Sequence, residues 1–266
     1  MISLRSRDNY ASITDYGRFP DNTLLMKLSI GEENEIVWKY ENDGELFAVY
    51  CIARHIKQRG YKVGLVMKYI PNARQDRVKE PRDVFTLKYF SELINSCGFN
   101  YVEVLDPHSP VSEALINNIR VDNGAEYIES VFKKLGDETV IYYPDNGAHK
   151  KYSSFISIPA CYGVKKRDWD SGKILGLDIS LNGLDIKGKT ILMVDDIIAY
   201  GGSMYYGAKE LKALGCGDIY IYATHIENSI LEGDLIKSGL FEKIYTTDSL
   251  FNKEHELIEI IGEDDI

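Results

Sequence analysis

The sequence has few of the features that mark disulfide-rich or zinc-binding proteins. Its 266 residues include only four cysteines, and none of them belongs to a Cys-x-x-Cys pair. Each cysteine lies in or beside an apolar or helical stretch, at Cys51, Cys97, Cys161 and Cys216. This pattern argues against a disulfide framework or a structural zinc site and predicts reduced, mostly buried thiols.

Long apolar segments are also absent. No uninterrupted apolar run reaches the roughly 18 residues of a membrane-spanning helix, and the opening stretch MISLRSRDNYAS holds no apolar run of signal-peptide length. We therefore expect a soluble cytoplasmic protein with no membrane partner.

Basic residues are fewer than acidic ones, with 31 Lys and Arg against 41 Asp and Glu, which gives a formal net charge of −10. Such a surface repels nucleic acid and anionic membranes, so we expect no nucleic-acid partner. Any ligand that carries phosphate must then be held by local groups, such as backbone N–H donors and a few placed cations.

Short β-rich runs alternate with helical patterns along the chain. The clearest helical pattern spans residues 83–97, where apolar side chains recur at steps of three and four, at Val84, Leu87, Phe90, Ile94 and Cys97. Gly98 follows as a stop signal. Residues 124–135 and 202–214 show the same pattern before a glycine, and the expected strands are 63–69, 101–106, 139–143, 190–196, 219–225 and 243–249. This alternation predicts an α/β fold of mainly parallel sheets joined by right-handed crossovers.

Polar clusters follow four of the expected strands. In parallel sheets, ligands bind beyond the carboxyl ends of the strands, because loops and helix N-termini gather there. The clusters are Arg74-Gln75-Asp76-Arg77, Asp106-Pro107-His108, Pro144-Asp145-Asn146-Gly147 and Asp195-Asp196. We therefore expect the chemistry of the protein at these strand ends.

The stretch TILMVDDIIAYGGS, residues 190–203, combines two kinds of binding group. We expect Asp195 and Asp196 at the frayed end of a strand, where both carboxylates can turn to the rim and accept hydrogen bonds from a vicinal diol. Gly201, Gly202 and Ser203 open a helix and offer backbone N–H groups to a phosphate. Diol and phosphate together predict a ribose phosphate. The alternative is that the acids only cap a helix or bind solvent.

The segment VDDIIAYGGS resembles the phosphoribosyl pyrophosphate loop shared by type I phosphoribosyltransferases and ribose-phosphate pyrophosphokinases. The resemblance implies that ribose 5-phosphate is bound by Asp195, Asp196, Ala199, Tyr200, Gly201, Gly202 and Ser203. Two positions depart from the family pattern. Tyr200 stands where a hydroxyl residue is usual, and Ala199 stands where the pyrophosphokinases often have an acid.

A second resemblance separates the two families. IPNARQDRV, a KEP turn and VEVLDPH are similar to the first half of a ribose-phosphate pyrophosphokinase, and PDNGAHKKY, KKR, Thr224-His225 and Thr247-Asp248-Ser249 follow in collinear order. The resemblance implies two tandem phosphoribosyltransferase-like domains. From spacing alone we place the boundary near residues 118–123, which gives domains 1–120, with the ATP-binding elements, and 121–266, with the sugar and catalytic loops.

The resemblance also implies roles in ATP binding, carried by Phe19, Asp21, Arg74, Gln75, Asp76 and His108. Arg74 is expected to hold the phosphates, although an RQDR run alone is usually a solvated turn. The adenine element departs from the family at Asn22-Thr23, the region between Lys27 and Asn42 looks trimmed, and HELIEIIGEDDI replaces the usual closing helix.

The magnesium ion carried by ATP is implied to contact His108 and Asp145. Mg²⁺ prefers oxygen ligands and keeps several waters, so Asp145 is the stronger candidate for a direct or water-bridged ligand. An Asx turn in PDNG is the competing interpretation of Asp145.

Lys165 and Arg167 match a Lys-x-Arg pattern on the catalytic loop of the family. Attack of the sugar O1 on the β-phosphorus of ATP spreads negative charge over phosphate oxygens, and cations placed there stabilise the transition state. Taken alone, a basic run of three residues is usually a surface feature.

The sequence thus predicts Mg²⁺-dependent transfer of a diphosphoryl group from ATP to ribose 5-phosphate, by a homo-oligomer of two or more chains. Two alternatives stay open. A phosphoribosyltransferase would leave RQDR and LDPH unexplained, and a non-catalytic regulatory homologue that binds ribose phosphates or nucleotides would be expected to lack the Lys165/Arg167 pair.

Overall fold

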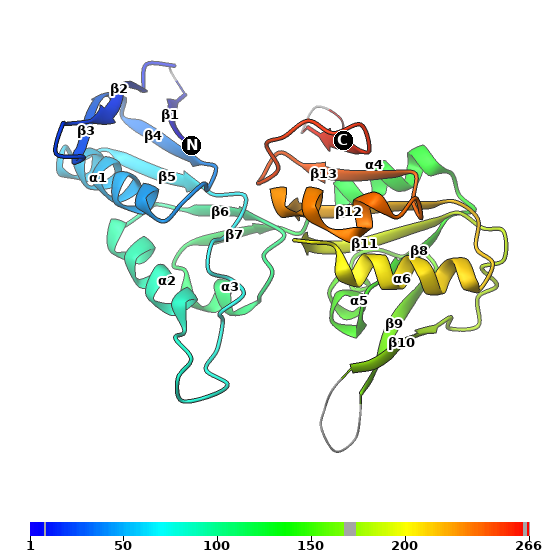
Figure 1. Cartoon of the computed structure of the whole chain (residues 1–266). Coiled ribbons are helices and arrows are strands. Elements are labelled where there is room, and N and C mark those ends of the chain that lie inside the picture. Colours follow the sequence, from blue (N-terminus) through cyan, green and yellow to red (C-terminus); the bar gives the residue numbers. More distant parts are fainter. Residues whose placement is uncertain (8, 168–173, 263–264, 266) are drawn as a thin grey trace. The chain divides into compact units, whose positions relative to one another are not determined.

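A computed structural model describes the chain apart from residues 8, 168–173, 263–264 and 266, and it leaves the side chains of residues 165–167 and 174–176 undescribed. Helices and strands alternate in two units, Met1–Asn123 and Gly124–Ile266 (Figure 1). Each unit is considered by itself.

Unit 1 is built on a five-stranded sheet in the order β1-β4-β5-β6-β7. Strand β1 (Ile2–Ser6) runs antiparallel to β4 (Glu33–Trp38), and the remaining neighbours are parallel: β5 (Lys62–Val66), β6 (Val102–Leu105) and β7 (Ile119–Asp122). The helices are α1 (Gly44–Gln58), α2 (Thr86–Cys97) and α3 (Val111–Leu115), and β2 (Ser12–Arg18) and β3 (Leu24–Ser29) form a separate hairpin.

Helix α2 starts three residues later than the apolar spacing predicts. It begins at Thr86, so Val84 lies outside the helix and is exposed, whereas Leu87, Phe90, Ile94 and Cys97 are buried as expected. The prediction failed at Val84 because the spacing of apolar residues does not distinguish a residue just before a helix from one in its first turn. Gly98 ends the helix with φ = 70°, in the left-handed region that favours glycine.

Unit 2 contains a seven-stranded sheet in the order β10-β9-β8-β11-β12-β13-β14. Its neighbours are parallel except for the β9–β10 pair. The strands are β8 (Val140–Tyr143), β9 (Ala160–Arg167), β10 (Ile174–Ser180), β11 (Ile191–Ile198), β12 (Ile219–Ile226), β13 (Lys243–Thr247) and β14 (Ile258–Ile261). The helices are α4 (Ala125–Leu135), α5 (Asn146–Tyr152), α6 (Gly202–Ala213), η1 (Asn228–Glu232) and α7 (Asp234–Lys237).

Adjacent tyrosines on β8 show that α5 and α6 cover opposite faces of this sheet. The hydroxyl of Tyr142 lies against Gly207 of α6, where a Cβ would come within 2.7 Å of it. The ring of Tyr143 instead stacks on Tyr152 of α5, with ring centroids 5.8 Å apart. Because neighbouring strand residues point to opposite faces, each residue of the adjacent strand β11 can be assigned to one helix or the other.

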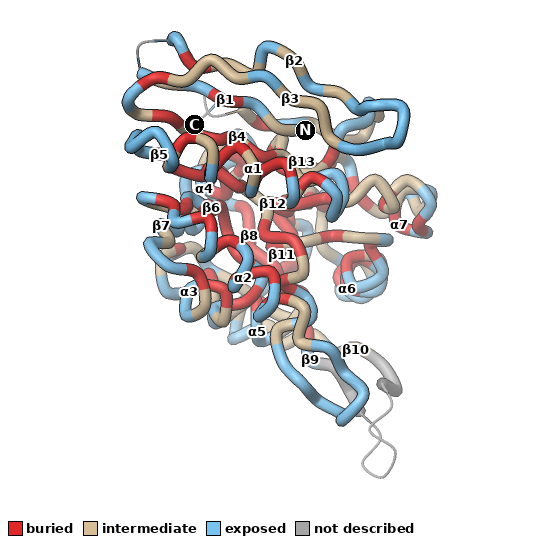
Figure 2. Tube along the Cα trace, turned by 90° about the vertical axis from the view of Figure 1, so that its left-hand side faces the viewer, coloured by how far each residue is buried: buried red, intermediate tan, exposed pale blue. Residues whose placement is uncertain are grey.

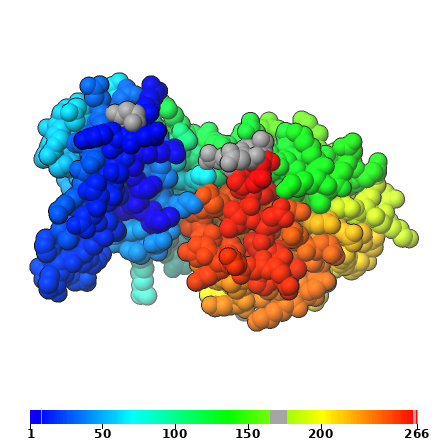
Figure 3. Space-filling model, turned by 90° about the horizontal axis from the view of Figure 1, so that it is seen from above, coloured from blue at the N-terminus to red at the C-terminus, as the bar shows by residue number. Residues whose placement is uncertain are grey.

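The central strands of both sheets are buried, as Figure 2 shows in red for β5 and β6 of unit 1 and for β8 and β11 of unit 2. The segment HELIEII, which the sequence places where a closing helix is usual, contains strand β14, parallel to β13. The C-terminal residues, coloured red, lie on the surface of unit 2 (Figure 3).

Among the described residues, none of the helices has the length and apolar character needed to cross a membrane. The four cysteines are free thiols, and Cys97 and Cys161 are buried.

Candidate functional site

The acidic pair Asp195-Asp196 lies inside strand β11, which continues to Ile198. The expectation that the pair ends the strand was therefore wrong, because β12 extends the ladder as far as Ile198 opposite Ile226. Pairing with β8 on the other side stops at Met193 opposite Tyr142. The two acids are thus held by backbone pairing on one edge and lie beyond the end of β8 on the other.

The two carboxylates lie in different surroundings. Asp196 faces α5, because its Oδ2 accepts a hydrogen bond from Lys151 Nζ at 3.1 Å. Alternation places Asp195 on the α6 face, and its Oδ1 accepts the backbone N–H of Asp196 at 3.0 Å. Burial, and secondarily the Asp196 carboxylate, raises the pKa of Asp195 well above the ordinary range of an aspartate.

The glycine-rich loop after β11 is shaped by contacts with the segment after β12. Gly201 is the N-cap of α6 with φ = 81°, and a Cβ there would lie 2.7 Å from Leu235. A Cβ on Gly233 would come within 1.9 Å of the carbonyl oxygen of Tyr200. Gly201 is buried against Leu235, whereas Gly202 and Ser203 are exposed and the position of a Cβ on Gly202 is open, so an anion can approach the start of α6 at these two residues. Ser203 and the ring of Tyr200 are both exposed beside this helix start.

Asp145 follows β8 and caps α5. Its Oδ1 accepts the N–H groups of Gly147 at 2.9 Å and Ala148 at 3.1 Å. The Asx-turn interpretation of PDNG is therefore correct for this carboxylate oxygen, and it also fixes the orientation of the side chain.

A carboxylate fixed in this way suits a hard cation that takes most of its ligands from water and phosphate oxygens, as Mg²⁺ does. In the described part of the chain, no cluster of three or more His, Cys, Asp or Glu side chains is arranged to hold a metal ion. The residues present therefore fit a metal that arrives with a phosphate ligand, and they do not form a complete protein cage.

Lys165 and Arg167 belong by their backbone to β9, and their side chains lie outside the described residues. In the hairpin with β10, Lys165 pairs with Leu177, and Arg167 pairs with Ile174. β9 pairs with β8 only from Ala160 to Tyr162, so the basic residues lie on the part of the strand beyond the end of β8.

Thr224-His225 and Thr247-Asp248-Ser249 bring the ends of β12 and β13 together. His225 Nδ1 and Ser249 Oγ share a hydrogen bond of 2.7 Å, and Ser249 Oγ also donates to Thr224 O at 3.1 Å. His225 and Ser249 are 1 % and 2 % exposed, which assigns this network to the interior of unit 2.

In unit 1, the RQDR loop follows β5 and is tied to its surroundings by two side chains. Gln75 Oε1 accepts a hydrogen bond from Thr86 Oγ1 at 3.0 Å, at the start of α2. Asp76 accepts hydrogen bonds from Arg77 at 2.6 and 2.7 Å and from Ser109 Oγ at 2.6 Å. Arg74 is exposed. The loop is therefore an ordered turn that presents Arg74, with Gln75 and Asp76 acting as its anchors.

His108 reaches the same edge of the sheet through the turn after β6. Asp106 turns the chain with φ = 44°, and its N–H donates to Asp122 O at 2.6 Å. Pro107 and Ser109 are buried, whereas His108 between them is exposed. Because Ser109 bonds to Asp76, the structure brings the RQDR loop and the LDPH turn together within unit 1.

Phe19 and Asp21 lie in the turn of the β2–β3 hairpin. Asp21 Oδ1 accepts hydrogen bonds from Thr23 Oγ1 at 2.7 Å and Thr23 N at 3.0 Å, and these bonds lower the pKa of Asp21. Phe19 is half exposed at this turn.

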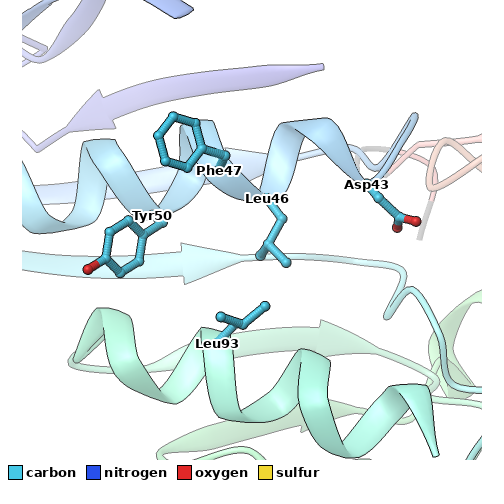
Figure 4. Close-up of a pocket in the computed structure, with 5 residues that line it drawn as sticks. All are labelled: Asp43, Leu46, Phe47, Tyr50 and Leu93. Atoms are coloured by element: carbon cyan, nitrogen blue, oxygen red, sulfur yellow. The ribbon is translucent and has the colours of Figure 1, made fainter. Parts of the chain in front are cut away.

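A further hollow of about 360 Å³ lies between α1 and α2 of unit 1. Leu46, Phe47 and Tyr50 of α1 line it together with Leu93 of α2, and Asp43 lies at one end (Figure 4). Its lining is apolar apart from one acid, which does not suit a phosphate ligand.

Reasoning from sequence missed the partners of the predicted residues. Arg77, Ser109 and Lys151 each pair with a predicted site residue; Arg77 and Lys151 lie within the RQDR and PDNGAHKKY motifs, and Ser109 directly follows LDPH.

Both units have the phosphoribosyltransferase-type architecture, a mainly parallel sheet flanked by helices. The crystal structure of phosphoribosylpyrophosphate synthetase from Mycobacterium smegmatis has the same fold. It matches with a TM-score of 0.76 at 17% identity, over 94% of this chain and 86% of that one.

Sequence comparison gives the same result. No protein-family model matches the chain. The ribose-phosphate pyrophosphokinase of Thermococcus kodakarensis is 28% identical over 218 residues, which cover 78% of this chain and 75% of that protein. The ribose-phosphate pyrophosphokinase of Caldanaerobacter subterraneus is 30% identical over 210 residues, which cover 75% of this chain and 64% of that protein. The chain belongs to the ribose-phosphate pyrophosphokinase family, as a divergent member.

Asp76→Asn is expected to lower the free energy of unfolding by about 1–2 kcal/mol at pH 7, because it removes the charge that holds Arg77 and Ser109. The Arg77 hydrogen bonds come first and the Ser109 bond second in lowering the pKa of Asp76 below its unfolded value of about 3.9. A carboxyl group whose pKa is lower in the folded than in the unfolded state stabilises the fold at pH values above the unfolded pKa. This stabilisation is lost as the pH falls through the folded-state pKa. Urea unfolding should therefore show a constant deficit from pH 5 to 8 that shrinks below about pH 4.

Ser109→Ala serves as the control, since it removes one of these hydrogen bonds and should cost less. Equal stability of the wild type and Asp76→Asn at pH 7 would contradict the assignment of Asp76 as an anchor.

Proposed function

We propose that the protein is a ribose-phosphate diphosphokinase, which converts ATP and ribose 5-phosphate to 5-phosphoribose 1-diphosphate and AMP. The observation that carries the proposal is the arrangement on β11 and α6, where two carboxylates precede a glycine turn at a helix start and Gly202 of that turn is exposed. The names of the relatives, and a fold match that extends over both units, favour a diphosphokinase over a simple phosphoribosyltransferase.

Ribose 5-phosphate is bound by unit 2 in this proposal. The carboxylates of Asp195 and Asp196 accept hydrogen bonds from the ribose hydroxyls, and the N–H groups of Gly201 and Gly202 receive the 5-phosphate, with Ser203 Oγ as a further donor. These donors carry no net charge, which suits a protein with a formal charge of −10. Ala199 and Tyr200 flank the phosphate, and Tyr200 adds an exposed ring where relatives have a hydroxyl residue.

ATP is bound by unit 1. Arg74 contacts its phosphates from a loop that Gln75 and Asp76 hold in shape. Phe19 supplies an exposed aromatic face for adenine, and Asp21 is held beside it by Thr23.

Asp145 and His108 are the residues proposed to contact the Mg²⁺ of the nucleotide. Asp145 provides a fixed carboxylate, and His108 contributes through a water molecule or a phosphate oxygen. Bound Mg²⁺ supplies positive charge that offsets the charge of the phosphate oxygens during transfer.

Lys165 and Arg167 are the proposed catalytic residues. When O1 of the sugar forms a bond to the β-phosphorus, the bond from that phosphorus to the oxygen of the α-phosphate breaks and AMP leaves. Lys165 follows the β-phosphate as a point charge, and the planar fork of Arg167 spans two oxygens, so both stabilise the developing negative charge.

We also propose that the protein acts in the cytoplasm as a homo-oligomer. Four free thiols and an acidic surface support a reducing, aqueous compartment. The proposal of an oligomer rests on the family resemblance.

Purified protein supplied with ATP, Mg²⁺ and ribose 5-phosphate should release AMP in step with phosphoribosyl diphosphate. The reaction can be followed by chromatography of the nucleotides, with a panel of other triphosphates to define the donor. AMP at background level from folded protein would refute the proposal.

Lys165→Ala is expected to lower turnover by about 10²–10⁴-fold, the effect of removing one group that stabilises transition-state charge. Binding of ribose 5-phosphate should be largely kept. Lys166→Ala is the matched control, since it occupies the variable position of the Lys-x-Arg pattern and should retain most of the activity. Equal turnover of the wild type and Lys165→Ala would show that Lys165 has no catalytic role.

A further inference from the structure

A lysine outside the proposed ligand contacts is paired with the second acid of the sugar site. Lys151 Nζ lies 3.1 Å from Asp196 Oδ2, although the two residues are 45 positions apart in the chain. The side chains of Lys151 and Asp196 are 26% and 10% exposed, so the pair is largely shielded from water. In such surroundings a charge-assisted hydrogen bond is stronger than one on the surface.

Helix α5 holds Lys151 in place through an aromatic layer. Tyr152 stacks on Tyr143 of β8, with ring planes 9° apart. His149 stacks on Tyr162 of β9, with ring centroids 4.6 Å apart. Lys151 Nζ lies 5.3 Å from the centre of the Tyr152 ring. The ammonium group therefore reaches Asp196 from a backbone that is fixed on two strands.

The position of Asp196 makes this pairing relevant to sugar binding. Asp195 and Asp196 are adjacent acids, and the repulsion between two neighbouring carboxylates opposes having both ionised and oriented. A cation on the Asp196 side compensates that repulsion and holds one oxygen in a set direction. A diol is recognised well only by acceptors whose direction is already fixed, because disordered acceptors lose entropy on binding.

We propose that Lys151 is a positioning residue of the sugar site, which orients the Asp196 carboxylate toward the ribose hydroxyls. The inference rests on the proposed function only in taking Asp195 and Asp196 as the diol acceptors. Lys151 acts through Asp196 and itself makes no contact with the reacting atoms.

The test compares Lys151→Met, Lys151→Arg and Lys150→Met with the wild type. Ribose 5-phosphate affinity is measured by calorimetry without ATP, and kcat and both KM values come from AMP release. Lys151→Met should weaken sugar affinity and raise its KM by about 10–100-fold, the scale of a lost hydrogen bond between charged groups. The KM for ATP should stay unchanged and kcat should fall by less than about 3-fold, since Lys151 stabilises no transition-state charge.

Two controls separate this role from a general effect on structure. Lys151→Arg keeps a cation that can reach Asp196 and should restore most of the affinity, and Lys150→Met removes the neighbouring exposed lysine and should resemble the wild type. If Lys151→Met does not fold, as judged by circular dichroism, Lys151→Gln makes the same comparison.

A double variant tests whether Lys151 acts through Asp196. If it does, Lys151→Met combined with Asp196→Asn should bind the sugar within about 3-fold of Asp196→Asn alone, because residues in one hydrogen-bonded pair are not additive. Wild-type affinity in Lys151→Met, a loss confined to kcat, or a double variant whose losses multiply would each overturn the inference.

The binding measurement also distinguishes this inference from the proposed function. A wild type that binds ribose 5-phosphate but releases no AMP refutes the diphosphokinase proposal, while a weakened Lys151→Met still supports the positioning role. A wild type that does not bind ribose 5-phosphate overturns both.

Discussion

The parallel ladder between β11 and β12 is the constraint on which the proposed sugar site depends. It continues to Ile198 opposite Ile226, whereas the ladder between β11 and β8 ends at Met193. This unequal pairing fixes the backbone of Asp195 and Asp196 from one edge. It leaves the other edge to the turn that follows β8, which carries Asp145 and starts α5. The acidic pair therefore lies close to the start of α5 on a strand that stays in register with β12 on both sides of Asp196.

The proposed function requires an acidic protein to hold phosphate ligands, and local arrangements in each unit support this. On unit 2, the groups available for a phosphate are backbone N–H donors at the start of α6, where Gly202 is exposed although Gly201 is buried against Leu235. On unit 1, Arg74 is exposed on a loop whose acid is already paired with Arg77 and Ser109. Local geometry thus compensates for a net charge that would by itself repel phosphate.

Pairing also distinguishes the roles of the acids in these motifs. Asp76 is held by an arginine and a serine, Asp145 caps a helix, and Asp196 faces a lysine, while the pKa of Asp195 is raised mainly by burial. Identical carboxyl groups are thereby given different pKa shifts and different hydrogen-bond partners by their surroundings. The proposed roles require such differences: Asp76 anchors a loop, Asp145 contacts the metal, and Asp195 and Asp196 contact the sugar.

The fold was largely accessible from the sequence because its signals are local. Apolar runs located the central strands, and Gly98 located the end of α2, since both depend on nearby residues. The start of α2 was misplaced because apolar spacing alone does not separate Val84 from the first turn, and the extent of β11 was misplaced because β12, a partner distant in the chain, decides it. For the same reason no local pattern revealed the pairing of Lys151 with Asp196, which joins two elements 45 residues apart.

Phosphorus NMR of the complete reaction mixture tests the central claim most directly, because it identifies which phosphoryl groups move. Transfer of the diphosphoryl group predicts AMP together with a sugar that carries a diphosphate on C1 and keeps its 5-phosphate. The appearance of ADP with a sugar bisphosphate, or of no new sugar phosphate while ribose 5-phosphate stays bound, would contradict the account.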